Sequence, residues 1–187
     1  MKNAKRRPWL TPVLVVLCLV ALVANAFALE RLPNGYYHTG DGVRQKKILF
    51  ASVDVYAIGH EMKELPPAKS KQAVIDADIS KRFIWKMKRD VDSEKIQNAL
   101  SEAYAMNGYT DKAKIGKFLA VFNKELKENQ IVTITYDADK KTTTLQVQGG
   151  GASATADGVD FMKATWRIWF GKIDQPSLGD ALISRLP

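Results

Sequence analysis

The chain has 187 residues, of which 46% are hydrophobic and 26% charged, with 7 Pro and 12 Gly. This composition excludes a disordered or collagen-like protein, and the length excludes a large multidomain enzyme and allows one compact domain plus a tail. The 28 Lys and Arg against 20 Asp and Glu give a net charge of +8, which at face value favours a nucleic-acid or membrane-surface partner.

The first 28 residues have the pattern of a secretory signal peptide. A basic head at residues 2–7 precedes an apolar run from Val13 to Val23, and small residues follow up to Ala28. A charged head, a short apolar stretch and a small-x-small end are the features of a cleaved export signal. We expect cleavage after Ala28, with a second possible site after Ala26 and an uncleaved membrane anchor as the alternative.

Export changes the charge and the cysteine content of the protein. Residues 1–28 contain four bases, no acids and the single cysteine, Cys18, so the 159 residues 29–187 keep 24 bases against 20 acids, a net charge of +4. These charges are scattered, and a nucleic-acid partner is therefore not expected. A mature domain without cysteine forms no disulfide and depends on its core. We expect one periplasmic domain with no stable membrane span after cleavage.

The first part of that domain has the pattern of β-structure. Residues 46–62 are rich in β-branched and aromatic side chains and predict one strand or two. The even positions, which include Tyr56, would face one side, and the odd positions 49–57 form a uniformly apolar face on the other. Residues 68–76 predict a short helix, and residues 79–89 alternate as in a half-buried strand.

Two amphipathic helices are predicted next. Asp92 or Ser93 caps a helix whose apolar residues recur at helical spacing, and Gly108 suits its end. Thr110 caps a second helix, in which an apolar stripe continues to Leu126. Each helix has one apolar face for the core.

The last part predicts a hairpin and two more helices. Residues 131–136 and 142–148 flank a polar turn and indicate an antiparallel pair. After the glycine link 149–151, residues 158–170 form a helix that is apolar nearly all round, which indicates burial between layers. Residues 176–186 predict a short closing helix. This order of elements predicts an α+β domain with helices on one face of an antiparallel sheet.

Few residues in the domain point to chemistry. The two histidines, His38 and His60, are far apart, and no cysteine completes a metal set, so we expect no metal site. No serine lies in a nucleophile-elbow pattern, and the three glycines lack the residues of a phosphate loop or dinucleotide turn, so we expect no cofactor. What remains is a basic residue before an apolar strand, Arg44, followed twelve residues later by Tyr56.

These segments resemble a known superfamily. The pattern Gly-x-Gly-x-Arg at 40–44, followed by Lys-Lys-Ile at 46–48 and Val-Tyr-Ala-Ile-Gly at 55–59, is similar to the opening of the chalcone isomerase-like superfamily, especially its bacterial exported branch. Residues 158–171, with a short helix behind them, look like its closing helices. The resemblance implies an open-faced β-sandwich, an antiparallel sheet with helices packed on one face.

The superfamily includes plant chalcone isomerases, fatty-acid-binding relatives and non-catalytic bacterial members. The resemblance implies that Arg44 matches the arginine that holds the substrate oxyanion in the enzymes and the carboxylate in the fatty-acid binders. A guanidinium can do both because its fork of donors fits either group and stays charged. Tyr56 matches a position that is threonine in the plant enzymes and tyrosine in the binders, so the pair resembles that of a binder.

The start of the first long helix differs from the plant enzymes. They carry a tyrosine just before a Ser-Glu-Lys helix start, where this chain has Asp92, and their later asparagine falls at Ala99, with Asn98 one place away. We therefore expect a non-catalytic protein that binds a fatty acid or similar amphipathic acid between sheet and helices, with Arg44 and Tyr56 as ligand-binding residues. The aromatic residues that offer apolar wall for such a pocket are Phe83, Trp85, Phe118, Phe122, Trp166 and Trp169.

Two alternatives stay open. One is an isomerase, an intramolecular lyase acting on a chalcone-like phenolic substrate, with Arg44, Tyr56 and Asn98 as catalytic residues. The other is a ligand-free interaction protein of the envelope.

Strand geometry sets a condition on the shared Arg44 and Tyr56 site, because a straight strand separates the two residues by about 40 Å at about 3.3 Å per residue. They share a pocket only if the chain turns back between them, and only Ala51-Ser52 offers a weak turn.

Overall fold

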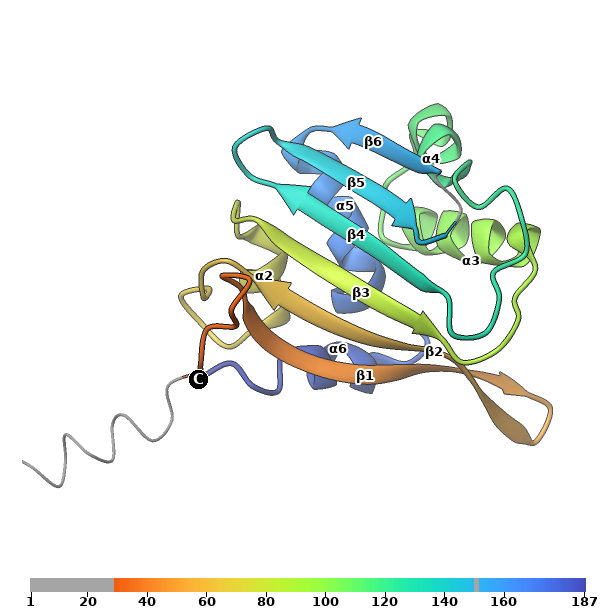
Figure 1. Ribbon diagram of the computed structural model, residues 1–187, viewed down its shortest axis with the longest axis horizontal. Coiled ribbons are helices and arrows are strands. Elements are labelled where there is room, and N and C mark those ends of the chain that lie inside the picture. Colours follow the sequence, from red (N-terminus) through yellow and green to blue (C-terminus); the bar gives the residue numbers. More distant parts are fainter. Residues whose placement is uncertain (1–28, 150–151) are drawn as a thin grey trace, which may run out of the picture.

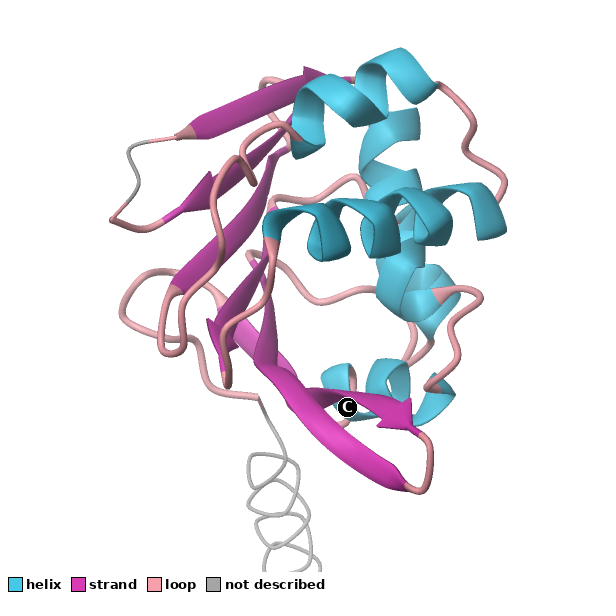
Figure 2. Cartoon of the chain, turned by 90° about the vertical axis from the view of Figure 1, so that its right-hand side faces the viewer, coloured by secondary structure: helices cyan, strands magenta, loops and turns pink. Residues whose placement is uncertain are grey.

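A six-stranded antiparallel sheet, with helices packed on one face, forms the framework of the computed structural model, which describes residues 29–149 and 152–187 (Figures 1 and 2). The predicted signal peptide, residues 1–28, lies outside the described residues. The strands are β1 (Tyr37–Ile48), β2 (Ala51–Met62), β3 (Lys81–Met87), β4 (Ile131–Asp137), β5 (Thr142–Val147) and β6 (Ser153–Asp157). The helices are α2 (Lys71–Asp76), α3 (Ser93–Met106), α4 (Lys112–Leu119), α5 (Val159–Phe170) and α6 (Pro176–Leu182). The predicted fold class is confirmed.

The strands follow one another across the sheet in sequence order, each antiparallel to the last. In β3 the residues Phe83, Trp85 and Met87 are buried and alternate with more exposed neighbours, and β4 and β5 show the same alternation. Side chains along a strand point to opposite faces in turn, so this pattern gives the sheet one core face. The helices cover that face, as Figure 2 shows from the side.

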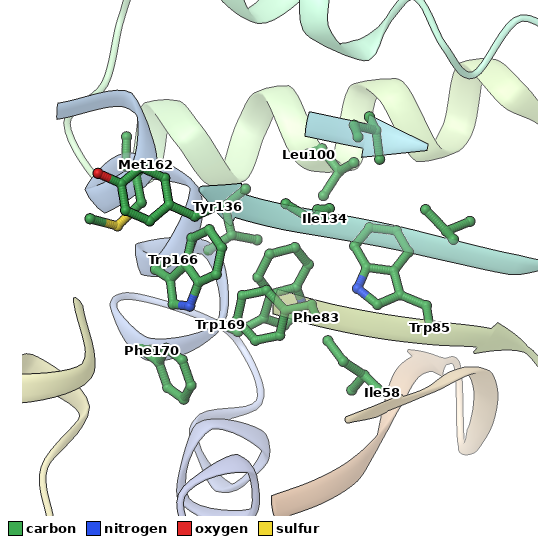
Figure 3. Close-up of a cluster of buried hydrophobic side chains, with 14 of the residues drawn as sticks. Ile58, Phe83, Trp85, Leu100, Ile134, Tyr136, Met162, Trp166, Trp169 and Phe170 are labelled. Atoms are coloured by element: carbon green, nitrogen blue, oxygen red, sulfur yellow. The ribbon is translucent and has the colours of Figure 1, made fainter. Parts of the chain in front are cut away.

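Helix α5 is the centre of the core. Eight of its twelve residues are buried, which confirms the predicted burial of this nearly all-apolar helix. The ring centroid of Phe83 lies 4.5 Å from that of Trp169 and 5.0 Å from that of Trp166, and Figure 3 shows these rings gathered between β3 and α5. Aromatic rings at such separations add specific contacts to the apolar area that they bury.

The segment predicted as one strand or two contains a sharp turn. Leu49 and Phe50 separate β1 from β2, and Leu49 takes a positive φ of 53°. Strand β1 also extends further than predicted, because it begins at Tyr37, nine residues before the predicted segment. The core face of β2 is the even one, with Tyr56 and Ile58 buried, and not the uniformly apolar odd face. Sheet pairing decides the buried face here, because both faces of β2 carry apolar residues.

Two further predictions need correction. The second amphipathic helix, α4, is capped by Asp111 rather than Thr110, and it ends at Leu119. The apolar stripe nevertheless reaches the core, because Phe122 and Leu126 are buried in the loop that follows. The segment after the glycine link contains a strand, β6, which its small residues did not indicate.

A buried polar network fastens α5 and α6 to the sheet. His60 Nε2 accepts a hydrogen bond from Trp166 Nε1 at 2.9 Å, and His60 Nδ1 lies 2.6 Å from Thr39 Oγ1. Because the indole can only donate, the Nδ1 of His60 carries the proton, and Thr39 donates to the Leu182 carbonyl at 2.8 Å. Burial, and then the charge of Lys81, hold the pKa of His60 well below its usual value. The imidazole is therefore neutral.

Lys81 is a second buried polar residue with a structural role. Its ammonium donates to the carbonyl oxygens of Val74 at 2.5 Å and Ala77 at 2.8 Å, at the C-terminal end of α2. A cation at this end of a helix satisfies free carbonyls and faces the negative end of the helix dipole. Burial lowers the pKa of Lys81 to about 7.

No helix among the described residues is both long and apolar enough to cross a membrane.

Candidate functional site

A cavity of about 530 Å³ lies beside the β1–β2 hairpin. Val53 and Val55 of β2 line one side, Ile96 and Leu100 of α3 line another, and α5 contributes Trp169. Charged side chains gather among these apolar walls, including those of Arg44, Lys95 and Asp174. A mostly apolar hollow with a few polar groups is the usual form of a small-molecule site, and its volume lies in the usual range of about 300–1,000 Å³.

The turn at Leu49 and Phe50 solves the distance problem between Arg44 and Tyr56. The two residues are direct cross-strand partners in the β1–β2 register, and both line the cavity. Next to them, Gln45 pairs with Asp54, so Val55 is an extra residue on β2. Such a bulge changes the direction of side chains on the bulged strand. It explains why Val55 and Tyr56, although adjacent in sequence, both line the same cavity.

The loop between α5 and α6 holds the Arg44 guanidinium. Nη1 lies 2.7 Å from Asp174 Oδ1 and 3.3 Å from Gln175 Oε1. Gln175 is itself fixed to β1, because it accepts from the Gln45 amide and donates to the Val43 carbonyl, each at 2.9 Å. Nε and Nη2 of Arg44 make no hydrogen bond to the described residues. These donors remain for an anionic group in the cavity.

Tyr56 is held from two sides. Its ring stacks on Trp85 with centroids 4.8 Å apart, and its hydroxyl oxygen accepts from Trp169 Nε1 at 3.1 Å. Burial raises the pKa of Tyr56 although the nearby Arg44 charge opposes the shift, so the phenol stays neutral. The hydroxyl proton has no acceptor among the described residues. Tyr56 thus offers a neutral donor beside the Arg44 cation.

The other predicted residues lie in different surroundings. Asp92 caps α3 by accepting from the amides of Glu94 and Lys95, and it lines the cavity. Ala99 also lines the cavity, whereas Asn98 is exposed and lies outside the lining. Of the six aromatic residues predicted as candidate walls, Trp169 lines this cavity and the others fill the core.

Sequence reasoning missed the partners that position the site. Asp174 and Gln175 lie some 130 positions after Arg44, and the Trp169 indole holds Tyr56 from 113 positions away. No local pattern signals contacts of that range. The one available sign was a polar Asp-Gln pair just before Pro176, at a junction between two apolar helices.

Comparisons with known proteins agree with the fold. Residues 36–182 match a family model described as chalcone isomerase-like. No curated protein matches the sequence. Among solved structures, the crystal structure of a fatty-acid binding protein from Arabidopsis thaliana is similar, with a TM-score of 0.66 and 15% identity over 86% of this chain and 92% of that chain. At this identity the likeness shows the shared fold.

Proposed function

The chain belongs to the chalcone isomerase-like family, and from this premise we propose that it is a non-catalytic member that binds a fatty acid or similar amphipathic acid. The acid group is held by Arg44 and Tyr56, and the alkyl chain lies along the apolar walls of the cavity. The protein is a bacterial exported member, delivered to the periplasm by residues 1–28 and cleaved after Ala28. The signal-peptide pattern of those residues supports this location.

The observation that carries the proposal is the cross-strand pair of Arg44 and Tyr56 at the cavity. The free donors of one guanidinium and one neutral phenol match the two oxygens of a carboxylate. Asp174 already places a carboxylate oxygen 2.7 Å from Arg44 Nη1. The Asp174 side chain is 66% exposed, so it can turn into water when a ligand acid takes its place.

The apolar walls suit the other half of such a ligand. Val53, Val55, Ile96, Leu100 and Ile168 line the cavity together with Trp169. Each CH₂ group that leaves water for such a surface contributes about 0.8 kcal/mol. An acyl chain therefore supplies most of the affinity, and the acid group fixes its orientation.

The isomerase alternative is less well supported. Asn98 lies outside the cavity lining, and Asp92 stands where the plant enzymes have a tyrosine. Without these donors the cavity still binds an anion but loses help in stabilising charge during cyclisation. The ligand-free alternative conflicts with a cavity of about 530 Å³ that contains free donors.

Mass spectrometry of small molecules extracted from the purified protein tests the proposal. We expect a co-purified fatty acid, its loss in Arg44→Ala, and its retention in Arg185→Ala, a matched control for an exposed arginine paired with Asp41. A protein that is empty but converts a chalcone would select the isomerase. A ligand retained by Arg44→Ala would show that Arg44 does not hold the acid.

The mass of the periplasmic product tests export, because cleavage after Ala28 leaves Leu29 as the first residue.

A further inference from the structure

The β1–β2 hairpin extends beyond the rest of the sheet. Strand β3 pairs with β2 from Tyr56 to Met62, so residues 45–54, here named the ribbon, pair only with each other among the described strands. Figure 1 shows this ribbon projecting past the end of β3. Lys46 and Val53 are partners within it, and both line the cavity. The base of the ribbon, at Lys46 and Val53, is therefore an outer wall of the ligand site, whereas its tip lies outside the lining.

The exposed large hydrophobic side chains of the described chain lie at the tip of the ribbon or in the cavity lining. They are Leu49 and Phe50, at 92% and 106% exposure, and Met106 at 52%. Leu49 and Phe50 form the tip of the ribbon, and Met106 lines the cavity. Single exposed apolar residues are ordinary when they are scattered. Leu49 and Phe50 are neighbours, almost fully exposed at a projecting tip, and such a pair indicates a surface that contacts an apolar phase.

Five cations without ion pairs in the described chain lie on the ribbon or in the cavity lining. Within the described chain no ion pair forms at Lys46 and Lys47 of the ribbon or at Arg89, Lys95 and Lys172 of the cavity lining. Most nearby carboxylates are already engaged. Asp174 pairs with Arg44, Asp90 pairs with Lys127, and Asp92 caps α3. Two carboxylates form no ion pair within the described chain, Glu102 of the cavity lining and Asp54 of the ribbon, which accepts from Gln45. The surplus of free cations is complementary to a negatively charged surface.

We infer that the ribbon docks on the surface of an anionic phospholipid bilayer. Leu49 and Phe50 enter the boundary between headgroups and acyl chains, and Lys46 and Lys47 lie against phosphate groups. An apolar tip combined with flanking cations is the combination that gives reversible binding at a membrane surface. Because Lys46 and Val53 at the base of the ribbon line the cavity, docking of the tip brings the cavity close to the lipid. The inference extends the proposed function, giving the amphipathic acid a route between bilayer and cavity.

A fluorophore at the tip tests docking in the full chain. Ala51→Cys, combined with Cys18→Ser, carries an environment-sensitive dye next to Leu49 and Phe50, and Lys112→Cys on α4 in the same background is the control position. We expect a blue shift of the tip dye with vesicles of phosphatidylcholine and phosphatidylglycerol. The shift should be small with phosphatidylcholine alone and absent at the control position. Adding Leu49→Ser and Phe50→Ser should abolish it, and Lys46→Gln with Lys47→Gln should weaken it.

Several outcomes would overturn the inference. An equal shift at both dye positions would mean that another part of the chain, such as residues 1–28, holds the protein at the vesicle. A shift that grows with protein concentration without vesicles would assign the tip to a second copy of the chain. An unchanged shift in the lysine variant would remove the charge argument. Fatty-acid binding in vesicle-free solution, measured on the same variants, tests the proposed function separately and should be unchanged by the ribbon substitutions at Leu49 and Phe50.

Discussion

Replacing Arg44 by glutamine tests the site through the charge of the ligand. The side chain is 21% exposed, and its Nε and Nη2 donors are free among the described residues. Hydrogen bonds to a charged group contribute about 1.5–3 kcal/mol, and the exposed pair with Asp174 that a ligand acid displaces is worth about 0.2–1 kcal/mol. The net loss for an acid ligand in Arg44→Gln is therefore about 0.5–2.8 kcal/mol, or about 2- to 100-fold in affinity.

The assay compares two ligands of equal chain length. Dodecanoate and dodecanol bury the same alkyl chain, but only the acid carries a charge at neutral pH. Isothermal titration should show the loss for dodecanoate and a change below about 2-fold for dodecanol. Arg185→Gln, on an exposed arginine outside the cavity lining, should change neither affinity.

One result would refute the reasoning. If Arg44→Gln weakened dodecanoate and dodecanol equally, the arginine would support the cavity wall without holding the acid. Unchanged binding of both ligands would place the acid elsewhere. Circular dichroism of the variant separates these results from a failure to fold.

Three other predictions concern the ion pair at the site and the stability of the fold. Asp174→Asn should strengthen dodecanoate binding by about 1.4- to 5-fold in the same titration, because a competing carboxylate is removed. The pKa of His60 is held well below 6.5 in the folded protein, so as pH falls below 6.5 the unfolded chain takes up a proton that the folded protein does not. The free energy of unfolding should then fall by about 1.4 kcal/mol per pH unit, and urea unfolding should show a weaker dependence in His60→Gln. Gly40→Ala should lower that free energy by about 1–3 kcal/mol or more, because its Cβ would lie 2.1 Å from a main-chain oxygen of α6. Gly116→Ala in α4, where an added Cβ would meet no other group within 4 Å, should raise the free energy of unfolding by about 0.5–1 kcal/mol. Equal effects of the two substitutions would contradict the packing of α6 on β1.

Local signals in the sequence predicted the elements whose ends are fixed by local chemistry. Asp92 caps α3 as expected, because its carboxylate accepts from the amides of the first turn. The polar turn after Asp137 joins β4 and β5 for the same kind of reason, since the aspartate oxygen accepts from the next backbone amides. The turn at Leu49 and Phe50 had no such signal. Two large apolar residues turn there because the pairing of β1 with β2 requires it.

The site was predictable only through the family resemblance. Composition and spacing identified Arg44 as a cation before an apolar strand, but the resemblance supplied Tyr56 as its partner. The structure gives the physical reason for the pair, which is a hairpin register with one extra residue, Val55. Asp174 and Gln175 come from the opposite end of the domain, where no periodicity connects them to β1.

The large separation in sequence between Arg44 and its partners has a consequence for the order in which the site forms during synthesis. Arg44 is made early, whereas Trp169, Asp174 and Gln175 are synthesised at least 125 residues later. A nascent chain can thus pair β1 through β6 before the residues that hold Arg44 and Tyr56 have been synthesised. On the proposed function, the acid is therefore bound only after α5 and residues 174–175 have been made, because these segments hold Arg44 and Tyr56.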